Sequence, residues 1–335
     1  MSKSVFECID AHTCGNPVRL IAKGAPILQG NNMSEKRQFF LNHFDWIRKG
    51  LMFEPRGHDM MSGAILFPPH NSKNDFSILF IETSGCLPMC GHGTIGIVTI
   101  ALEENLIKPN VEGVLKIEVP AGTIEVNYKM KNEKVEWVEI RNVDSYLADR
   151  NLIIHSDYMG EIKFDVSYGG NFYAIIESQK NYFGLKNYRA EELISFSREI
   201  RDKINKKYAN RFILPIDKSI RDVSHILWTG QVLDNKSSSR NAVFYGDKAI
   251  DRSPCGTGSS ARMAQLFSQN KLKVGEAFIH ESYIGSKFIC RIEKSSKIHN
   301  IDGISPIIRG WAKIHGYNKI IVDSSDPFYQ GFQVI

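Results

Sequence analysis

The sequence lacks any long hydrophobic run. None of its 335 residues belongs to a segment long enough to span a bilayer, and the start of the chain (MSKSVFE) has no apolar core of signal-peptide length. These absences argue against a membrane partner and lead us to expect a cytoplasmic protein. A reducing compartment would also suit a protein that depends on free thiols.

Cysteine is scarce, and neither sign of charge dominates. Six cysteines are scattered without the spacing of a disulfide scaffold. The net charge is only +5, and the basic runs are diluted by acids, which argues against a nucleic-acid partner. Low-complexity tracts and long linkers are missing too. With 42% hydrophobic residues, the chain can form one large globular domain or two ordinary ones.

What the sequence does contain is a repeated motif, Cys-Gly-x-Gly-[Ser/Thr], that each time follows a proline by one or two residues. The first copy is residues 88–94 (PMCGHGT) and the second is residues 254–259 (PCGTGS). Their cysteines, Cys90 and Cys255, lie 165 positions apart (255 minus 90), close to half the chain. Self-similarity at this distance predicts two related halves, each contributing one copy to a shared site.

Each motif precedes a segment predicted to be helical. Residues 94–106 are apolar on almost every face, and residues 259–271 are also rich in apolar side chains. We therefore expect Cys90 and Cys255 at helix N-termini, where free N–H groups and the helix dipole shift a thiol toward thiolate and can hold a carboxylate. Two such thiols suit inversion of a stereocentre next to a carboxylate, because one removes the α-proton and the other returns one to the opposite face.

Three other interpretations compete for the same residues. Residues 91–96 fit the glycine-rich dinucleotide fingerprint, although a loop separates them from the preceding strand. Cys86, Cys90 and His92 could form a zinc site, although they lack Cys-x-x-Cys spacing. Finally, the two cysteines could be buried and inert. The duplicated surroundings favour the acid–base interpretation.

The remaining pattern favours an α+β fold with many strands and few helices. Helices are predicted at residues 35–49 and 190–207, the latter with Leu193, Phe196, Ile200 and Ile204 on one stripe. Strands are predicted at residues 5–9, 19–22, 65–67, 76–81, 114–119, 123–128, 135–140, 162–166, 171–176, 223–228, 242–245, 277–280, 287–292, 307–314 and 320–322. We expect the boundary between the halves near residues 120–130.

The chain resembles the proline racemase and hydroxyproline epimerase family. The matching stretches are residues 10–13 (DAHT), 54–58 (EPRGH), 87–96 (LPMCGHGTIG), 251–258 (DRSPCGTG) and 326–327 (DP). The resemblance implies a diaminopimelate-epimerase-like fold: two pseudo-symmetric domains, each a sheet wrapped around a central helix, with the active site between them. We expect domains at 1–125 and 126–322, the first completed by a C-terminal strand at about 323–335.

The resemblance also implies a cofactor-free, two-base reaction at a cyclic imino acid, without a metal. Cys90 and Cys255 would be catalytic. Asp251 would bind the substrate and could pair with its ring ammonium, or it could be a helix cap. Gly91, His92, Gly256 and Thr257 would surround the substrate carboxylate and nitrogen. His225 could hydrogen-bond a ring hydroxyl, although a lone histidine in an apolar strand is usually a packing residue.

From these features we expect the activity of a 4-hydroxyproline 2-epimerase, which interconverts trans-4-hydroxy-L-proline and cis-4-hydroxy-D-proline. Proline racemase is the nearest alternative. A trans-3-hydroxy-L-proline dehydratase is the next, although that activity resembles chains whose second cysteine is replaced, and Cys255 is present here. A non-catalytic imino-acid-binding protein is the alternative from another class. A homodimer would be an ordinary assembly.

Overall fold

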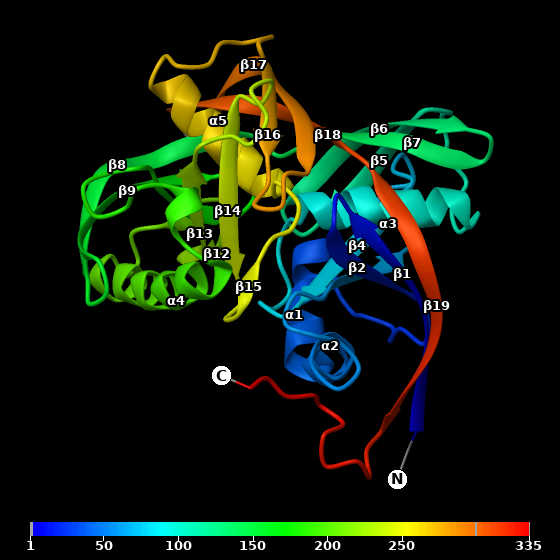
Figure 1. Cartoon of the computed structure of the whole chain (residues 1–335). Helices are drawn as coiled ribbons and strands as arrows, with labels where there is room; N and C mark the ends of the chain where they lie inside the picture. Colours follow the sequence, from blue (N-terminus) through cyan, green and yellow to red (C-terminus); the bar gives the residue numbers. More distant parts are fainter. Residues whose placement is uncertain (1–2, 299, 335) are drawn as a thin grey trace. The chain divides into compact units, whose positions relative to one another are not determined.

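The chain folds into two units, and the first uses both of its ends. The structure is a computed structural model that describes residues 3–298 and 300–334 (Figure 1). The first unit comprises Met1–Ile140 and Gly310–Ile335, and the second comprises Arg141–Arg309. The expected division at residue 125 instead falls within β6 (Gly122–Lys131), whose residues 122–127 pair with β5 (Val114–Val119) and hold it in the first unit.

The return of the chain to the first unit is also longer than the expected segment at about 323–335. Strand β19 (Ala312–Asp323) pairs antiparallel with β1 (Lys3–Thr13) from Lys3 opposite Asp323 to Thr13 opposite Ala312. Figure 1 shows the two strands, one blue and one red, side by side. Because this ladder runs along all of β1, the first unit contains the whole of β19.

The sheet of the first unit continues from β1 through consecutive partners. These are β2 (Asn16–Lys23), antiparallel to β1; β3 (Ser62–Phe67), parallel to β2; β4 (Phe76–Glu82), antiparallel to β3; and β5, parallel to β4. Strand β7 (Lys134–Arg141) follows β6. All seven residues of β4 are buried, as expected of a strand covered on both faces.

Two short helices stand where one was predicted. Helix α1 (Met33–His43) begins after Asn32, whose side chain accepts a hydrogen bond from the Glu35 N–H, and ends at Phe44. Helix α2 (Asp45–Met52) follows directly. The prediction of one helix at 35–49 is wrong because Phe44 adopts a non-helical backbone conformation (φ −133°, ψ 10°).

The central helix of the first unit is α3 (Gly91–Glu103), and twelve of its thirteen residues are buried. It contacts β1, β2, β3 and β19. At Gly96 an added Cβ would lie 2.3 Å from Cγ1 of Val18, so only glycine lets the helix approach β2 this closely. The predicted all-apolar helix is confirmed, although it begins three residues earlier than expected.

The strands of the second unit close into a ring around α5 (Gly256–Ser268). In order of pairing they are β8 (Ser145–Ser156), β9 (Gly160–Tyr168), β10 (Phe172–Ile176), β13 (Val223–Gly230), β14 (Ser239–Tyr245), β16 (Ala277–Glu281), β17 (Lys287–Ile298) and β18 (Ile301–Gly310), which returns to β8. Helix α5 contacts β8, β9, β10 and β17, and its first ten residues are buried.

The outer helix of the second unit is α4 (Ala190–Lys207), with the bounds that the sequence predicts. Leu193, Ile200 and Ile204 are buried, as predicted, whereas Phe196 is only partly buried. The helix packs on β8, β13, β14 and β15 (Ala249–Ile250). A 3₁₀ turn (Leu185–Asn187) and the small hairpin of β11 (Ile213–Leu214) and β12 (Asp217–Arg221) complete the unit.

One strand prediction is wrong, and four strands were not predicted, namely β8, β11, β12 and β15. A single strand at 307–314 does not form, because β18 ends at Gly310 and β19 begins at Ala312. Strand β8 was not predictable from the pattern, because its residues 147–151 are less buried than its ends and do not alternate cleanly. The expected fold class is confirmed: each unit is α+β, with strands around one buried helix that follows a cysteine. In the parts of the chain described, no helix is both long and apolar enough to cross a membrane.

Candidate active site

Cys90 is the N-cap residue of α3, at the end of a loop that leads from β4. Its Sγ accepts a hydrogen bond from the N–H of Gly93 at 3.3 Å. A Cβ at position 93 would lie 2.8 Å from this sulfur, so the glycine allows its N–H to reach the thiol. Cys90 is only 3% exposed. The predicted position of Cys90 at a helix N-terminus is therefore confirmed.

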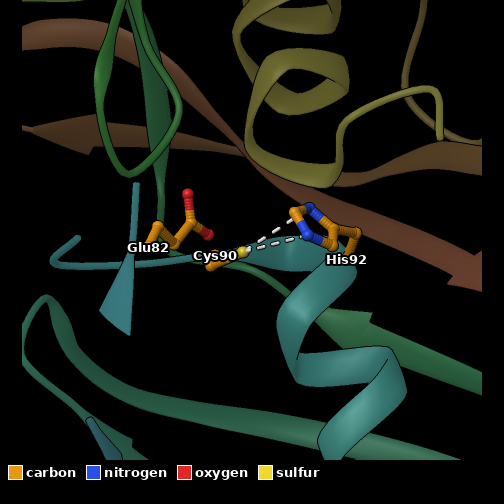
Figure 2. A group of neighbouring side chains, drawn as sticks. All are labelled: Glu82, Cys90 and His92. Atoms are coloured by element: carbon orange, nitrogen blue, oxygen red, sulfur yellow. Dashed lines mark hydrogen bonds between the residues drawn. The ribbon is translucent and has the colours of Figure 1, made fainter. Parts of the chain in front are cut away.

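His92 lies beside Cys90 in the first turn of the same helix. Its Nδ1 is 3.5 Å from Sγ of Cys90 (Figure 2). Its Nε2 is 3.0 Å from the side-chain nitrogen of Asn16 on β2. Because an amide nitrogen only donates, Nε2 is the acceptor and the proton of the neutral ring lies on Nδ1, facing the sulfur. This N–H would stabilise a thiolate at Cys90.

Glu82 is the third member of this group, and it was not among the predicted site residues. It is the last residue of β4, it is 1% exposed, and its carboxyl points toward Cys90 (Figure 2). A carboxylate oxygen, the Cys90 sulfur and a His92 ring nitrogen lie within 4.8 Å of one another, close enough to ligate one metal ion. Cys86, which the zinc interpretation required, does not belong to this group.

Cys255 occupies the equivalent position before α5. Its Sγ accepts a hydrogen bond from the Gly258 N–H at 3.3 Å, the same geometry as at Cys90 and Gly93. A Cβ at position 258 would lie 3.1 Å from the sulfur. Unlike Cys90, however, Cys255 has a positive φ of 63°, which is unusual for a residue with a side chain. The two copies therefore share the thiol–glycine contact but differ in backbone conformation.

Two hydroxyl groups accompany the Cys255 thiol. The hydroxyl of Tyr173 on β10 is 3.4 Å from Sγ and 2.5 Å from the Thr257 hydroxyl, which itself lies 3.8 Å from Sγ. Tyr173 is 82 positions from Cys255 in the chain. Thr257 was predicted as a site residue, but Tyr173 was not, because no local motif marks it.

The electrostatics of Cys255 differ from the sequence-based expectation of a thiol shifted toward thiolate. Burial, and secondly the Asp251 carboxylate, raise the pKa of Cys255 to about 12, although contacts with Tyr173, Gly258 and Thr257 lower it. Removing the thiolate from water therefore costs more than the helix N–H groups return. A neighbouring cation that compensates Asp251 would make this thiol easier to ionise.

The predicted residues Asp251 and His225 lie in the same unit as Cys255. Asp251 is 2% exposed, and its Oδ1 accepts a hydrogen bond from the Ser253 N–H at 2.7 Å. His225 is 3% exposed, and its ring lies against that of Tyr173 with centroids 4.7 Å apart. Tyr173 thus links His225 to Cys255. The structure groups Asp251, Gly256, Thr257 and His225 around Cys255, and it groups Gly91 and His92 around Cys90.

Other stretches that carry the family resemblance support the fold. The guanidinium of Arg56 donates to the carbonyls of Gly50 (2.7 Å) and Tyr329 (2.8 Å) and pairs with Asp326 at 3.2 Å. It therefore joins two of the matching stretches and ties the end of the chain to α2. Arg56 is therefore a structural residue of the first unit.

Comparison with known proteins extends these observations to the whole chain. The sequence profile described as "Proline racemase" matches residues 8–333. A protein of Spirosoma linguale named 4-hydroxyproline 2-epimerase is 58% identical over 336 residues, which is 100% of both chains. A protein of Shewanella loihica with the same name is 55% identical over 335 residues, again 100% of both chains.

Two solved structures are also similar. A hydroxyproline epimerase from Agrobacterium vitis, solved with bound trans-4-hydroxy-L-proline, has a TM-score of 0.89 and 24% identity, with 99% of this chain and 96% of that chain covered. A probable proline racemase from Agrobacterium radiobacter has a TM-score of 0.90 and 26% identity, with 98% and 96% covered. With two cysteine N-caps and a family profile that spans nearly its full length, this chain belongs to the proline racemase family.

Proposed function

We propose that the protein is a 4-hydroxyproline 2-epimerase, which interconverts trans-4-hydroxy-L-proline and cis-4-hydroxy-D-proline without a cofactor. The observation that carries the proposal is the duplicated thiol site: Cys90 and Cys255 each cap a buried helix and each accept a glycine N–H. Identity of 58% to a full-length relative of that name supports the choice of substrate.

In the proposed mechanism one thiolate removes the proton from Cα, and the other cysteine, as a thiol, delivers a proton to the opposite face. Which cysteine is the base depends on which enantiomer is bound. N–H groups at the starts of α3 and α5 would bind the substrate carboxylate and stabilise the negative charge that develops on it. At each cysteine a glycine N–H lies 3.3 Å from the sulfur and would stabilise the thiolate form that acts as the base.

The substrate amine would complete the electrostatics at Cys255. A ring ammonium near Asp251 would neutralise the carboxylate that raises the pKa of this thiol. His225 would hydrogen-bond the C4 hydroxyl of the substrate. Proline has no C4 hydroxyl and would not form this hydrogen bond, so the site would favour hydroxyproline over proline.

The proposal is tested by α-proton exchange in deuterated water with trans-4-hydroxy-L-proline. We expect Cys90→Ser and Cys255→Ser each to abolish exchange, because serine is far too weak an acid to replace either thiol at neutral pH. Full exchange in either variant would contradict the two-base mechanism. No exchange in the wild-type protein, with intact imino-acid binding, would favour a binding protein.

The second candidate is proline racemase, which is favoured by the similar fold of a probable proline racemase. Optical rotation measured with trans-4-hydroxy-L-proline and with L-proline distinguishes the two. Rapid change with proline alone would reject our choice. Ketone formation from trans-3-hydroxy-L-proline would instead indicate a dehydratase. In either catalytic case we propose a reducing compartment such as the cytoplasm, since all six cysteines are free thiols.

A further inference from the structure

Cys90 has almost no direct contact with solvent, because only 3% of the residue is exposed. In the proposed function, however, each turnover leaves the two cysteines with their protonation states exchanged. The enzyme must then lose a proton from one thiol and gain one at the other before it accepts the same enantiomer again. The further inference rests on that function and concerns the route of the Cys90 proton.

Glu82 is placed to receive this proton. One of its carboxyl oxygens and the Cys90 sulfur lie within 4.8 Å of each other, a distance that one water or a side-chain rotation bridges. The carboxyl is buried, yet among the described residues no ion pair involves it. The nearest guanidinium, that of Arg48, pairs with Asp45 at 2.6 Å and donates to the backbone carbonyl of Glu82 at 2.8 Å. Glu82 is therefore not committed to a cation.

Beyond Glu82 the route reaches the surface in one step. The Ser84 hydroxyl donates to Oε2 of Glu82 at 3.3 Å, and Ser84 is exposed. Glu82 and Ser84 flank Thr83 at the turn after β4, where Glu82 and Gly85 exchange backbone hydrogen bonds (2.8 and 3.1 Å). The turn thus holds a buried acid and an exposed hydroxyl in contact.

We propose that Glu82 and Ser84 form the proton route between Cys90 and solvent, with Glu82 as a positioning residue that shares one proton with the thiol. In the outward direction the S–H bond breaks and an O–H bond forms on Glu82. The acid proton passes to Ser84, whose own proton goes to water. Cys90 is again a thiolate, Glu82 is again ionised, and one proton has entered the solvent.

The surroundings of Glu82 suit this role. Burial raises the pKa of Glu82, and contacts with Cys90, Ser84 and Ser62 partly offset the rise. Because its pKa is raised, the buried Glu82 carboxyl holds a proton more readily than an exposed glutamate does, as a group that relays a proton must. The titratable groups near the carboxyl are Cys90, His92 and Cys86, and the charges acting on Cys86 show that Arg37, Arg48 and Asp45 also lie nearby.

The first test needs no substrate and follows alkylation of Cys90 by iodoacetamide against pH, with the modified peptide quantified by mass spectrometry. A thiol that shares a proton with an acid shows a bend in the pH profile where that acid ionises, because the new carboxylate disfavours the thiolate. We expect this bend in the wild-type protein and in Glu82→Asp. In Glu82→Gln the rate should rise tenfold per pH unit until the thiol itself titrates. Superimposable wild-type and Glu82→Gln profiles would overturn the proposal.

The second test uses steady-state kinetics with trans-4-hydroxy-L-proline. Slow proton exchange in the free enzyme limits turnover only at high substrate, so Glu82→Gln should lower kcat by roughly 10-fold or more and lower KM in parallel. The value of kcat/KM should change far less. A parallel fall of kcat and kcat/KM would place Glu82 in the chemical step or in the fold and would overturn the proposal, as would unchanged kcat.

Two further variants control the experiment. Glu103→Gln removes another side-chain carboxylate from the far end of α3, where it pairs with Lys134. This variant should keep the kcat and KM of the wild type. Ser84→Ala should lower kcat less than Glu82→Gln, because water can replace an exposed hydroxyl. If Glu103→Gln lowered kcat and KM as much as Glu82→Gln does, the assignment to Glu82 would be overturned. If the wild-type protein turns over no imino acid, the proposed function fails, whereas the alkylation result still tests the shared proton.

Discussion

At the scale of single residues, the cysteines of the two motif copies have unlike neighbours although the motifs are alike. Cys90 lies beside the His92 imidazole and the Glu82 carboxyl. Cys255 lies beside the hydroxyl groups of Tyr173 and Thr257, and the charge of Asp251 raises its pKa. The sequence suggests two interchangeable thiols. The structure instead indicates that each thiol has its own proton affinity and its own response to mutation.

The surroundings of Cys255 predict opposite effects for two conservative substitutions. Asp251→Asn removes a charge that raises the thiol pKa, so alkylation of Cys255 should begin at a pH lower by about one unit. Tyr173→Phe removes a contact that lowers the pKa, so the profile should move to higher pH. Peptide-resolved alkylation over a pH series measures both.

A charge change elsewhere in the second unit serves as the control. Asp234→Asn breaks a surface ion pair with Lys287. This variant should not shift the pH profile of Cys255 alkylation. Shifts of the same sign in Asp251→Asn and Tyr173→Phe would contradict this account of the thiol.

At the scale of elements, a single carboxylate organises the loop between β3 and β4. Glu118 on β5 accepts hydrogen bonds from the backbone N–H groups of His70 and Asn71, both at 2.9 Å, from the Asn74 amide at 2.8 Å and from the Ser77 hydroxyl at 3.1 Å. Burial alone would raise the pKa of Glu118, but these donors lower it to about 2.

Glu118→Gln should therefore lower the free energy of unfolding by roughly 2 kcal/mol at pH 7, less than the full value of a pKa shift of this size because solvent screens part of the interaction. Because the folded pKa lies below the unfolded one, the stabilisation is present above pH 4.5 and is lost as the pH falls toward 2. Urea unfolding at pH 7 and at about pH 3.5 measures this effect. The difference in free energy of unfolding between the variant and the wild type should be smaller at the lower pH.

A surface glutamate provides the comparison for this measurement. Glu136→Gln removes an exposed ion pair with Lys129 in the same unit and should have little effect on unfolding at either pH. A difference between Glu118→Gln and wild type that is equally large at both pH values would show that lost packing, and not lost charge, destabilises the variant.

The elements also show what can be predicted from sequence. Helices α3 and α5 follow from apolar composition and from the motif that begins each one. Their first turns, rich in glycine, begin earlier than expected because a cysteine cap and buried packing outweigh the low helix propensity of glycine. The contact between Tyr173 and Cys255 could not be predicted, because it joins residues 82 positions apart through the pairing of strands. For Glu82 the sequence offers only a weak indication, which is that a charged residue directly follows the apolar residues of a predicted strand.

At the scale of the whole molecule, the first unit depends on the last strand of the chain. Removing residues 310–335 would uncover the outer edge of β1 and take Val322, which is 2% exposed, out of the hydrophobic core. We expect a chain ending at Arg309 to lose amide protection throughout the first unit, while the continuous second unit keeps it. Hydrogen exchange read by mass spectrometry reports on each unit separately.

A shorter truncation is the matched control. A chain ending at Gln330 keeps β19 and the residues that bind Arg56, so its exchange pattern should match that of the full chain. If first-unit peptides stay protected in the chain that ends at Arg309, then β19 is dispensable and this view of the unit is wrong.

The closing of the first unit by β19 also sets an order of events at the ribosome. Residues 3–140 are synthesised first, but the edge of β1 stays unpaired until β19 has been translated. The segment 141–309 has all of its strands available sooner and can finish before its predecessor. Vectorial synthesis therefore completes the C-terminal half of this protein before the N-terminal half.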